Sequence, residues 1–216
     1  MDRSFIHSFL WDESKYPLGS GFLTALRERR YSRMEREVRI EDFLVTKKQK
    51  EFEYDFFKKS EGYERWEDVD FDGVYEIEKT FTVEVEDIKA YSEGILDDNP
   101  LFNDEEAAKK GPYGSLIAHP LFLTPIGFWL TGDSGPGSWS RTPGAINPGQ
   151  RIEFYEHIRP GDVIRVKTRF YDKWIKRGKR YLTYLSEYYN QNDKMVAKWW
   201  GTLILPTSKG NGSHTF

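Results

Sequence analysis

The sequence predicts an α+β domain in which one antiparallel sheet wraps around a single apolar helix, with an N-terminal helical arm. Residues 74–83 and four later segments alternate apolar and polar side chains, as half-buried strands do. The segment Leu116–Leu130 is almost entirely apolar, so as a helix it must be buried on most sides. A single curved sheet around that helix satisfies this need, although the pattern alone also allows other α+β arrangements.

The expected order is strand, short helix, irregular segment, apolar helix and four strands. Residues 84–93 form an amphipathic helix, residues 97–113 are irregular because they are rich in Asp, Asn, Pro and Gly, and residues 131–148 form a loop. The four strands are Arg151–His157, Val163–Trp174, Arg180–Tyr189 and Val196–Leu205. Turns at Pro160–Asp162, Lys176–Lys179 and Asn190–Lys194 join them.

Three regions follow from this order. Residues 1–74 carry many charges and no strand alternation, and apolar residues recur at helical spacing at 22–26 and again from Ile40. We interpret them as a helical arm packed on the domain or on a partner; a partly disordered, solvated tail is the alternative. The main domain covers residues 75–206, and residues 207–216 form a flexible tail.

The composition excludes several classes of function. With 32 basic and 35 acidic residues, the net charge of −3 gives no reason to expect nucleic acid or an anionic membrane as a partner. The absence of cysteine excludes thiolate nucleophiles and cysteine-based zinc sites. No signal peptide or membrane-spanning run is visible, so the default expectation is a cytoplasmic protein. No pair of histidines has ligand spacing and no nucleotide-phosphate loop is present, so neither metal nor cofactor is expected.

Two segments resemble the MaoC-like hydratases and dehydratases, which have the hot-dog fold. They are FTVEVEDIKAYSEGILDDNPLFNDEEAAKKGPYGSLIAHPLF and GQRIEFYEHIRPGDVIRVKTRF, and together the likeness spans about 130 residues, residues 75–206. Within the family, the Asp97–Asp98 pair and the following Glu-Glu-x-Ala run are more similar to the substrate-binding subunit of mycobacterial-type (3R)-hydroxyacyl-carrier-protein dehydratases. The resemblance implies an acyl-CoA or acyl-carrier-protein thioester substrate and a homo- or hetero-oligomer of hot-dog subunits.

The resemblance also implies a candidate site with one departure from the family. Hydration of a 2-enoyl thioester needs an activated water, a proton for C2 and stabilisation of the thioester oxygen. In the family an Asp and a His from a run resembling G-D-x-N-P-L-H supply the acid–base chemistry. Here Asp97 matches the Asp and Asn99 matches the Asn, whereas Phe102 stands at the position of the His. Phenylalanine transfers no proton, which favours a substrate-binding subunit beside a catalytic partner.

Other residues offer alternatives. His119 could act with Asp97 in a self-sufficient homodimeric hydratase, although relatives that keep the dyad also have a His at this position. Gly114 and Ser115 precede the apolar helix and could help bind the thioester, and Trp129 could line an acyl slot. Without the resemblance, Asp97 would simply be a turn former. A non-enzymatic acyl-CoA-binding hot-dog protein is the third hypothesis.

Overall fold

The computed structural model describes residues 40–52, 66–132, 135–142 and 144–206. Contacts between residues divide the chain after Val45. In the first unit the described residues contain one 3-10 turn, η3 (Ile40–Phe43). The second unit, from Thr46 onward, holds the sheet and the remaining helices. The predicted helix at residues 22–26 and the tail at 207–216 lie outside the described residues.

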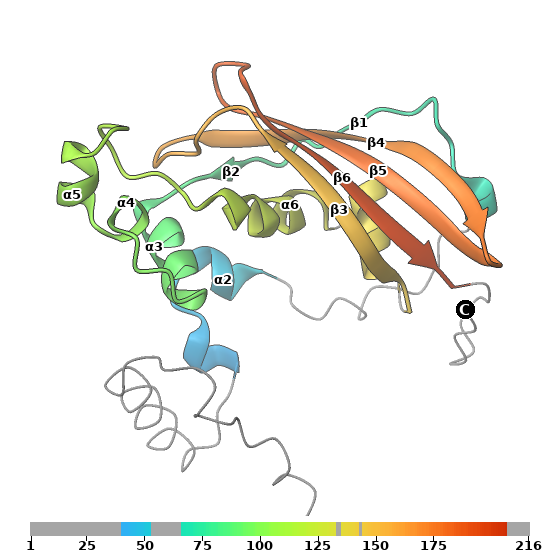
Figure 1. Cartoon of the computed structure of the whole chain (residues 1–216), viewed down its shortest axis with the longest axis horizontal. Coiled ribbons are helices and arrows are strands. Elements are labelled where there is room, and N and C mark those ends of the chain that lie inside the picture. The colour runs from blue at the N-terminus through green and yellow to red at the C-terminus, as the bar shows by residue number, and fades with distance from the viewer. Residues whose placement is uncertain (1–39, 53–65, 133–134, 143, 207–216) are drawn as a thin grey trace, which may run out of the picture. The chain divides into compact units, whose positions relative to one another are not determined.

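The sheet is antiparallel and has six strands (Figure 1). They are β1 (Tyr75–Glu76), β2 (Phe81–Thr82), β3 (Ile146–Phe154), β4 (Val163–Lys176), β5 (Lys179–Tyr189) and β6 (Met195–Leu205). The order is β1-β4-β5-β6-β3, and β2 also pairs with β4. The β4–β5 hairpin turns at Arg177–Gly178, where both residues have positive φ, as a tight two-residue turn requires.

One helix, α6 (Leu123–Thr131), lies along the concave side of this sheet (Figure 1). Three further helices, α3 (Val85–Gly94), α4 (Pro100–Asn103) and α5 (Glu105–Lys110), follow β2. Helix α2 (Lys47–Glu51) precedes them, and 3-10 turns occupy Trp66–Asp68 (η4), Pro120–Phe122 (η5) and Pro136–Arg141 (η6). This confirms the predicted architecture, a sheet wrapped around one apolar helix. None of the helices in the described ranges is long and apolar enough to cross a membrane.

Several predicted boundaries were wrong. The apolar helix begins at Leu123 rather than Leu116, because Pro120 disfavours a helical conformation in the residue before it. Residues 116–119 have no regular secondary structure instead, and Ala118 N donates to Ile158 O. The predicted first strand is interrupted and gives only β1 and β2. Strand β3 starts at Ile146, five residues earlier than predicted.

The irregular segment 97–113 contains α4 and α5, which were not predicted. Asn99 caps α4 and is followed by Pro100 in the first helical turn. Asp104 caps α5, which has Glu105 and Glu106 in its first turn and lysines in its last. Both patterns suit a helix dipole and its unpaired terminal groups.

Helix α6 packs very closely against the sheet at Gly127. A Cβ atom there would lie 2.8 Å from Trp199 Cζ3 and 2.8 Å from Tyr188 Oη. Both aromatic side chains are buried and belong to the central strands β5 and β6. The helix backbone therefore rests directly on the side chains of the sheet.

Gly127→Ala is expected to destabilise the protein by about 1–3 kcal/mol, because the added methyl group overpacks this contact. Gly94, at the end of α3, is the matched control, since nothing lies within 4 Å of its Cβ position. Gly94→Ala is expected to stabilise by up to about 1 kcal/mol through helix propensity. Urea denaturation of both variants tests the opposite signs; equal stabilisation by both would show that α6 does not approach the sheet this closely.

The concave face of the sheet carries a group of buried polar side chains. Ser186 Oγ lies 3.2 Å from Thr168 Oγ1, and Tyr184 and Tyr188 are on the same strand and face. Tyr184, Ser186 and Tyr188, together with Trp199 and residues of α6 and η6, line a small cavity with room for about one water molecule. Burial raises the pKa of Tyr184 to about 12, and burial also raises the pKa of Tyr188.

These tyrosines make stability depend on alkaline pH. Unfolded tyrosines ionise near pH 10, whereas Tyr184 keeps its proton until about pH 12. Its contribution is therefore present below pH 10 and is lost as pH rises through this window, at up to about 1.4 kcal/mol per pH unit. Urea midpoints measured from about pH 9 to about pH 11 should fall less steeply in Tyr184→Phe than in wild type. Equal slopes would contradict the burial of the Tyr184 hydroxyl.

The convex face carries a row of alternating charges across five strands. In order they are Glu76, Lys167, Glu187, Lys198 and Glu153, and each is the register partner of the next. Lys198 Nζ lies 2.9 Å from Glu187 Oε1, and Lys167 pairs with Glu76. Opposite charges in direct cross-strand positions stabilise the pairing of the strands.

The tandem Trp199–Trp200 divides between the two faces of the sheet, as successive residues of a strand do. Trp199 is buried in the core under α6. Trp200 lies on the convex face, where Arg151 sits 5.0 Å above its ring and Tyr171 contacts it edge to face. Strand β6 therefore contributes Trp199 to the core and Trp200 to the convex face.

Candidate active site

Asp97 follows directly on the end of α3. Asp97 N donates to Ser92 O and Leu96 N donates to Glu93 O, which is the Schellman pattern of helix termination. Leu96 occupies the left-handed position with φ 60, where glycine is usual. A non-glycine residue in this region is strained, and the strain lies next to the candidate acidic residue.

The next turn fixes the Asp97 carboxylate. Asp97 Oδ1 accepts a hydrogen bond from Asn99 N at 3.0 Å, and Asn103 Nδ2 donates to Asp97 O at 2.7 Å. Asn99 Oδ1 accepts from Leu101 N and so starts α4. Asp97 is thus the turn former that its sequence context predicts. Its second carboxylate oxygen, Oδ2, is not used in this turn.

Helix α4 turns Phe102 inward, where only 8% of the residue is exposed. Its ring contacts His119 edge to face, with the ring centroids 5.4 Å apart. Ile117 N donates to Leu101 O, and this bond holds the segment before His119 against α4. Phe102 therefore fills space directly beside the His119 imidazole.

His119 is oriented by the turn that it begins. Its Nδ1 accepts a hydrogen bond from Leu121 N at 3.1 Å, and Pro120 follows as the first residue of η5. Because Nδ1 is an acceptor, a neutral His119 carries its proton on Nε2. Nε2 lies 4.0 Å from Asp97 Oδ2, so the N–H and the carboxylate face each other across a gap longer than a hydrogen bond.

The structure therefore brings Asp97, Phe102 and His119 together, although they are up to 22 residues apart in sequence. It adds Tyr91 of α3, whose ring lies 6.0 Å from the His119 ring. Burial raises the pKa of Tyr91, so its phenol stays protonated. Sequence reasoning missed Tyr91, because nothing in its neighbourhood distinguishes it from a core aromatic residue.

The remaining predicted site residues, Gly114, Ser115 and Trp129, make their contacts outside this group. Ser115 Oγ accepts a hydrogen bond from Arg159, which also donates to Tyr113 O. Gly114 has φ +67, and nothing lies within 4 Å of its Cβ position. Trp129 is on α6 and contacts Phe81 edge to face. Within the described ranges, no cluster of three His, Asp or Glu side chains is arranged to hold a metal ion.

The sequence of this region matches a known family model. Residues 73–199, more than half of the 216-residue chain, match the "FAS1-like, dehydratase domain region" model. The chain belongs to this family. The match covers Asp97, Asn99, Phe102 and His119, and it agrees with the MaoC-like resemblance of the sequence.

Relatives point the same way. The chain is 32% identical over 81 residues to the 3-hydroxybutyryl-CoA dehydratase of Methylorubrum extorquens, covering 38% of this chain and 48% of the relative. The chain thus spans about half the length of that relative.

Solved structures share the fold. The MaoC-like dehydratase of Rhodospirillum rubrum is 26% identical with a TM-score of 0.54, covering 64% of this chain and 94% of that one. The (3R)-hydroxyacyl-ACP dehydratase complex HadBC of Mycobacterium tuberculosis is similar in fold at 20% identity, with a TM-score of 0.54 and coverage of 62% and 95%. The hot-dog dehydratase architecture is confirmed.

Proposed function

We propose that this FAS1-like dehydratase-region chain is the substrate-binding subunit of an acyl-thioester hydratase/dehydratase and works beside a catalytic hot-dog subunit. The proposal rests on the position and packing of Phe102. It lies five residues after Asp97, at the position where the family has its histidine, and it packs against His119. The imidazole that would activate water in this position is replaced by a ring that cannot accept or donate a proton.

The other site residues keep roles in binding. The Nε2–H of His119 and the Tyr91 hydroxyl are hydrogen-bond donors that can hold a thioester oxygen. Asp97, Asn99 and α4 hold the wall of the site in shape. The substrate is an acyl thioester of CoA or of acyl carrier protein, and the partner supplies the acid–base dyad.

A specific observation favours a second function, that of a self-sufficient homodimeric hydratase. The carboxylate of Asp97 and the Nε2 of His119 lie 4.0 Å apart, close enough for one water or substrate atom to join them. In that case Asp97 would act as base and His119 as donor. A non-enzymatic acyl-CoA-binding protein is the outcome if neither the chain nor its complex has activity.

The proposal includes assembly through the edge of the sheet. Among the described strands, β3 pairs with β6 on one side only, and most of its residues are exposed. Exposed edges of this kind invite pairing with another chain, which in a hot-dog oligomer makes two sheets continuous. We expect a dimer or tetramer in light scattering at micromolar concentration, and a strict monomer would count against the proposal.

Hydration of crotonyl-CoA tests the proposal. The purified chain alone is expected to turn over more slowly than about 1 per second, whereas its complex with a hot-dog subunit that carries an intact Asp-x-Asn-Pro-x-His run should reach typical enzyme rates. Asp97→Asn and His119→Gln distinguish the two candidates. If the chain alone is active and both variants lose that activity, the self-sufficient hydratase is correct.

A further inference from the structure

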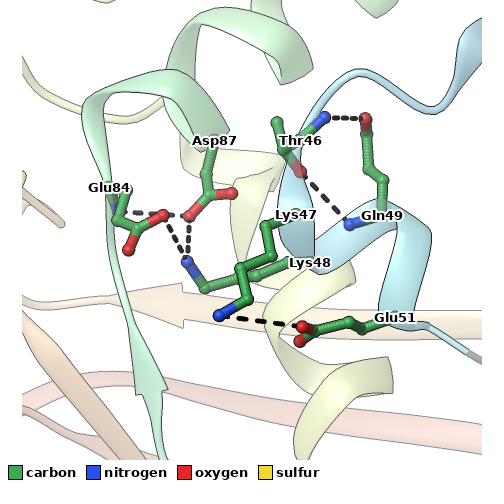
Figure 2. Close-up of polar contacts among 7 residues, drawn as sticks. All are labelled: Thr46, Lys47, Lys48, Gln49, Glu51, Glu84 and Asp87. Carbon is green, nitrogen blue, oxygen red and sulfur yellow. Dashed lines mark hydrogen bonds and ion pairs between the residues drawn. The ribbon is translucent and has the colours of Figure 1, made fainter.

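Residues 46–52, which include helix α2, pack on the domain through two sets of contacts. Helix α2 starts with a capping box, in which Thr46 Oγ1 accepts from Gln49 N and Gln49 Oε1 accepts from Thr46 N (Figure 2). Lys48 points from this helix toward the start of α3, where its Nζ lies 2.6 Å from Asp87 Oδ2 and 3.2 Å from Glu84 Oε2. We call residues 46–52 the strap.

The second anchor of the strap is aromatic. The Phe52 ring stacks on Trp129 of α6 with a centroid distance of 6.2 Å and an interplanar angle of 23°. Lys48 Nζ also lies 5.0 Å from the centre of the Phe81 ring. The strap therefore covers aromatic side chains of α6 and β2.

A continuous row of rings runs from under the strap to the candidate site. Trp129 contacts Phe81 at 6.0 Å, Phe81 contacts Phe122 at 6.0 Å and Phe122 contacts Tyr91 at 5.5 Å. Tyr91 then reaches His119 at 6.0 Å. The row is apolar apart from its last two members, and its Phe81 and Phe122 rings are buried in the core. It is therefore a compatible lining, rather than an open groove, for an alkyl chain that enters from the thioester site.

The other side of α6 offers no such route. At Gly127 the helix backbone rests on Trp199 and Tyr188, and the adjoining cavity has room for about one water molecule and is lined partly by hydroxyl groups. An alkyl chain there would have to separate α6 from the sheet. The strap is a weaker barrier, because a five-residue helix has little stability of its own and local opening begins at such elements.

We propose that the acyl chain of the substrate lies along this aromatic row, under the strap, and that Phe52 limits the length of chain that the domain admits. This inference rests on the proposed function, since it assigns the acyl part of the same thioester site. Short chains end before Trp129 and leave the strap in place. Longer chains reach the position of Phe52 and must displace it, which costs the stack on Trp129 and strains the Lys48 contacts.

Calorimetric titration with butyryl-, octanoyl- and dodecanoyl-CoA tests this assignment. Phe52→Ala is expected to bind dodecanoyl-CoA at least about tenfold more tightly than wild type does, because each newly buried methylene is worth about fourfold in affinity. Butyryl-CoA should bind both proteins equally. Lys48→Met, which releases the strap without changing its rings, should shift the chain-length profile in the same direction.

Two controls share the chemistry of these substitutions but not their position. Lys47→Met alters the same helix at an exposed side chain, and Tyr171→Ala removes a half-exposed ring on the convex face of the sheet. Both should keep the wild-type profile. Hydrogen exchange of the α2 amides gives a readout in the unaltered protein, and it should rise with dodecanoyl-CoA but not with butyryl-CoA.

The outcomes distinguish a failure of the strap assignment from a failure of the proposed function. If acyl-CoA binds but the ratio of dodecanoyl to butyryl affinity is the same in wild type, Phe52→Ala and Lys48→Met, the strap assignment is wrong and the proposed function stands. If no acyl-CoA binds to any of the proteins, the proposed function fails and this inference fails with it. If both variants unfold, unchanged α2 exchange in wild type saturated with dodecanoyl-CoA overturns the assignment.

Discussion

Phe102→His is expected to raise the hydration rate of the isolated chain by about 100-fold, the low end of what positioned acid–base groups contribute. The new imidazole would lie beside His119 and within the same cluster as Asp97, because Phe102 already contacts the His119 ring. We expect the low end of this range because a misplacement of the imidazole by about 1 Å can cost a hundredfold in rate. Initial rates with crotonyl-CoA near neutral pH give the measurement.

Phe102→Asn is the control for this prediction. Like Phe102→His, it puts a polar side chain into this buried position, but asparagine has no group that titrates near neutral pH. Both variants must first show a cooperative thermal transition, since each buries polar atoms where a phenyl ring was. Equal rates for the His and Asn variants would mean that position 102 is not a lost catalytic position.

Lys48→Met is expected to lower the free energy of unfolding by about 1.5–3 kcal/mol, because it removes a charged hydrogen bond from a buried carboxylate. The side chain of Asp87 is only 5% exposed, and besides Lys48 it accepts a hydrogen bond from Glu84 N. Methionine keeps most of the volume of the lysine stem, so lost packing contributes little. Urea denaturation near pH 7 measures the change.

Lys47→Met gives the comparison, because Lys47 is in the same helix but its side chain is 82% exposed and pairs with Glu51 at 3.8 Å. A change within about 0.5 kcal/mol is expected there. For Lys48, burial favours the neutral amine, but the hydrogen bonds to Asp87 and Glu84 outweigh it and raise its pKa. The stabilisation is therefore fully present at pH 7 and is lost only as pH rises through the raised pKa. Equal losses in both variants would contradict the buried pair.

The strands were predictable because their side-chain alternation is a local property. The segments 163–174, 180–189 and 196–205 agree with β4, β5 and β6 to within two residues, and the turn at Gly178 has the positive φ that glycine permits. The start of α6 was misplaced because three apolar residues, Leu116–Ala118, lie shortly before Pro120 and look helical by composition. The cap residues Asn99 and Asp104 were readable signals of α4 and α5 that the composition of the segment obscured.

The candidate site was only partly predictable. The motif placed Asp97, Asn99 and Phe102 together because they lie within six residues. The meeting of Asp97 with His119 depends on the bond between Ile117 N and Leu101 O, which is a tertiary contact. The contribution of the strap was hidden for the same reason: the Thr46–Gln49 capping box can be read from the sequence, but the contact of Phe52 with Trp129 cannot.

The row of alternating charges on the convex face affects the register in which β5 and β6 pair. A slip of two residues between β5 and β6 keeps every side chain on its own face, so the alternation of apolar and polar residues cannot prevent it. Such a slip would place Glu187 opposite Trp200 or Val196 and Lys198 opposite Leu185 or Tyr189. Only the native alignment completes the row from Glu76 to Glu153. At the β5–β6 boundary the Glu187–Lys198 pair therefore adds an electrostatic preference for the native alignment to the one set by the turn between the strands.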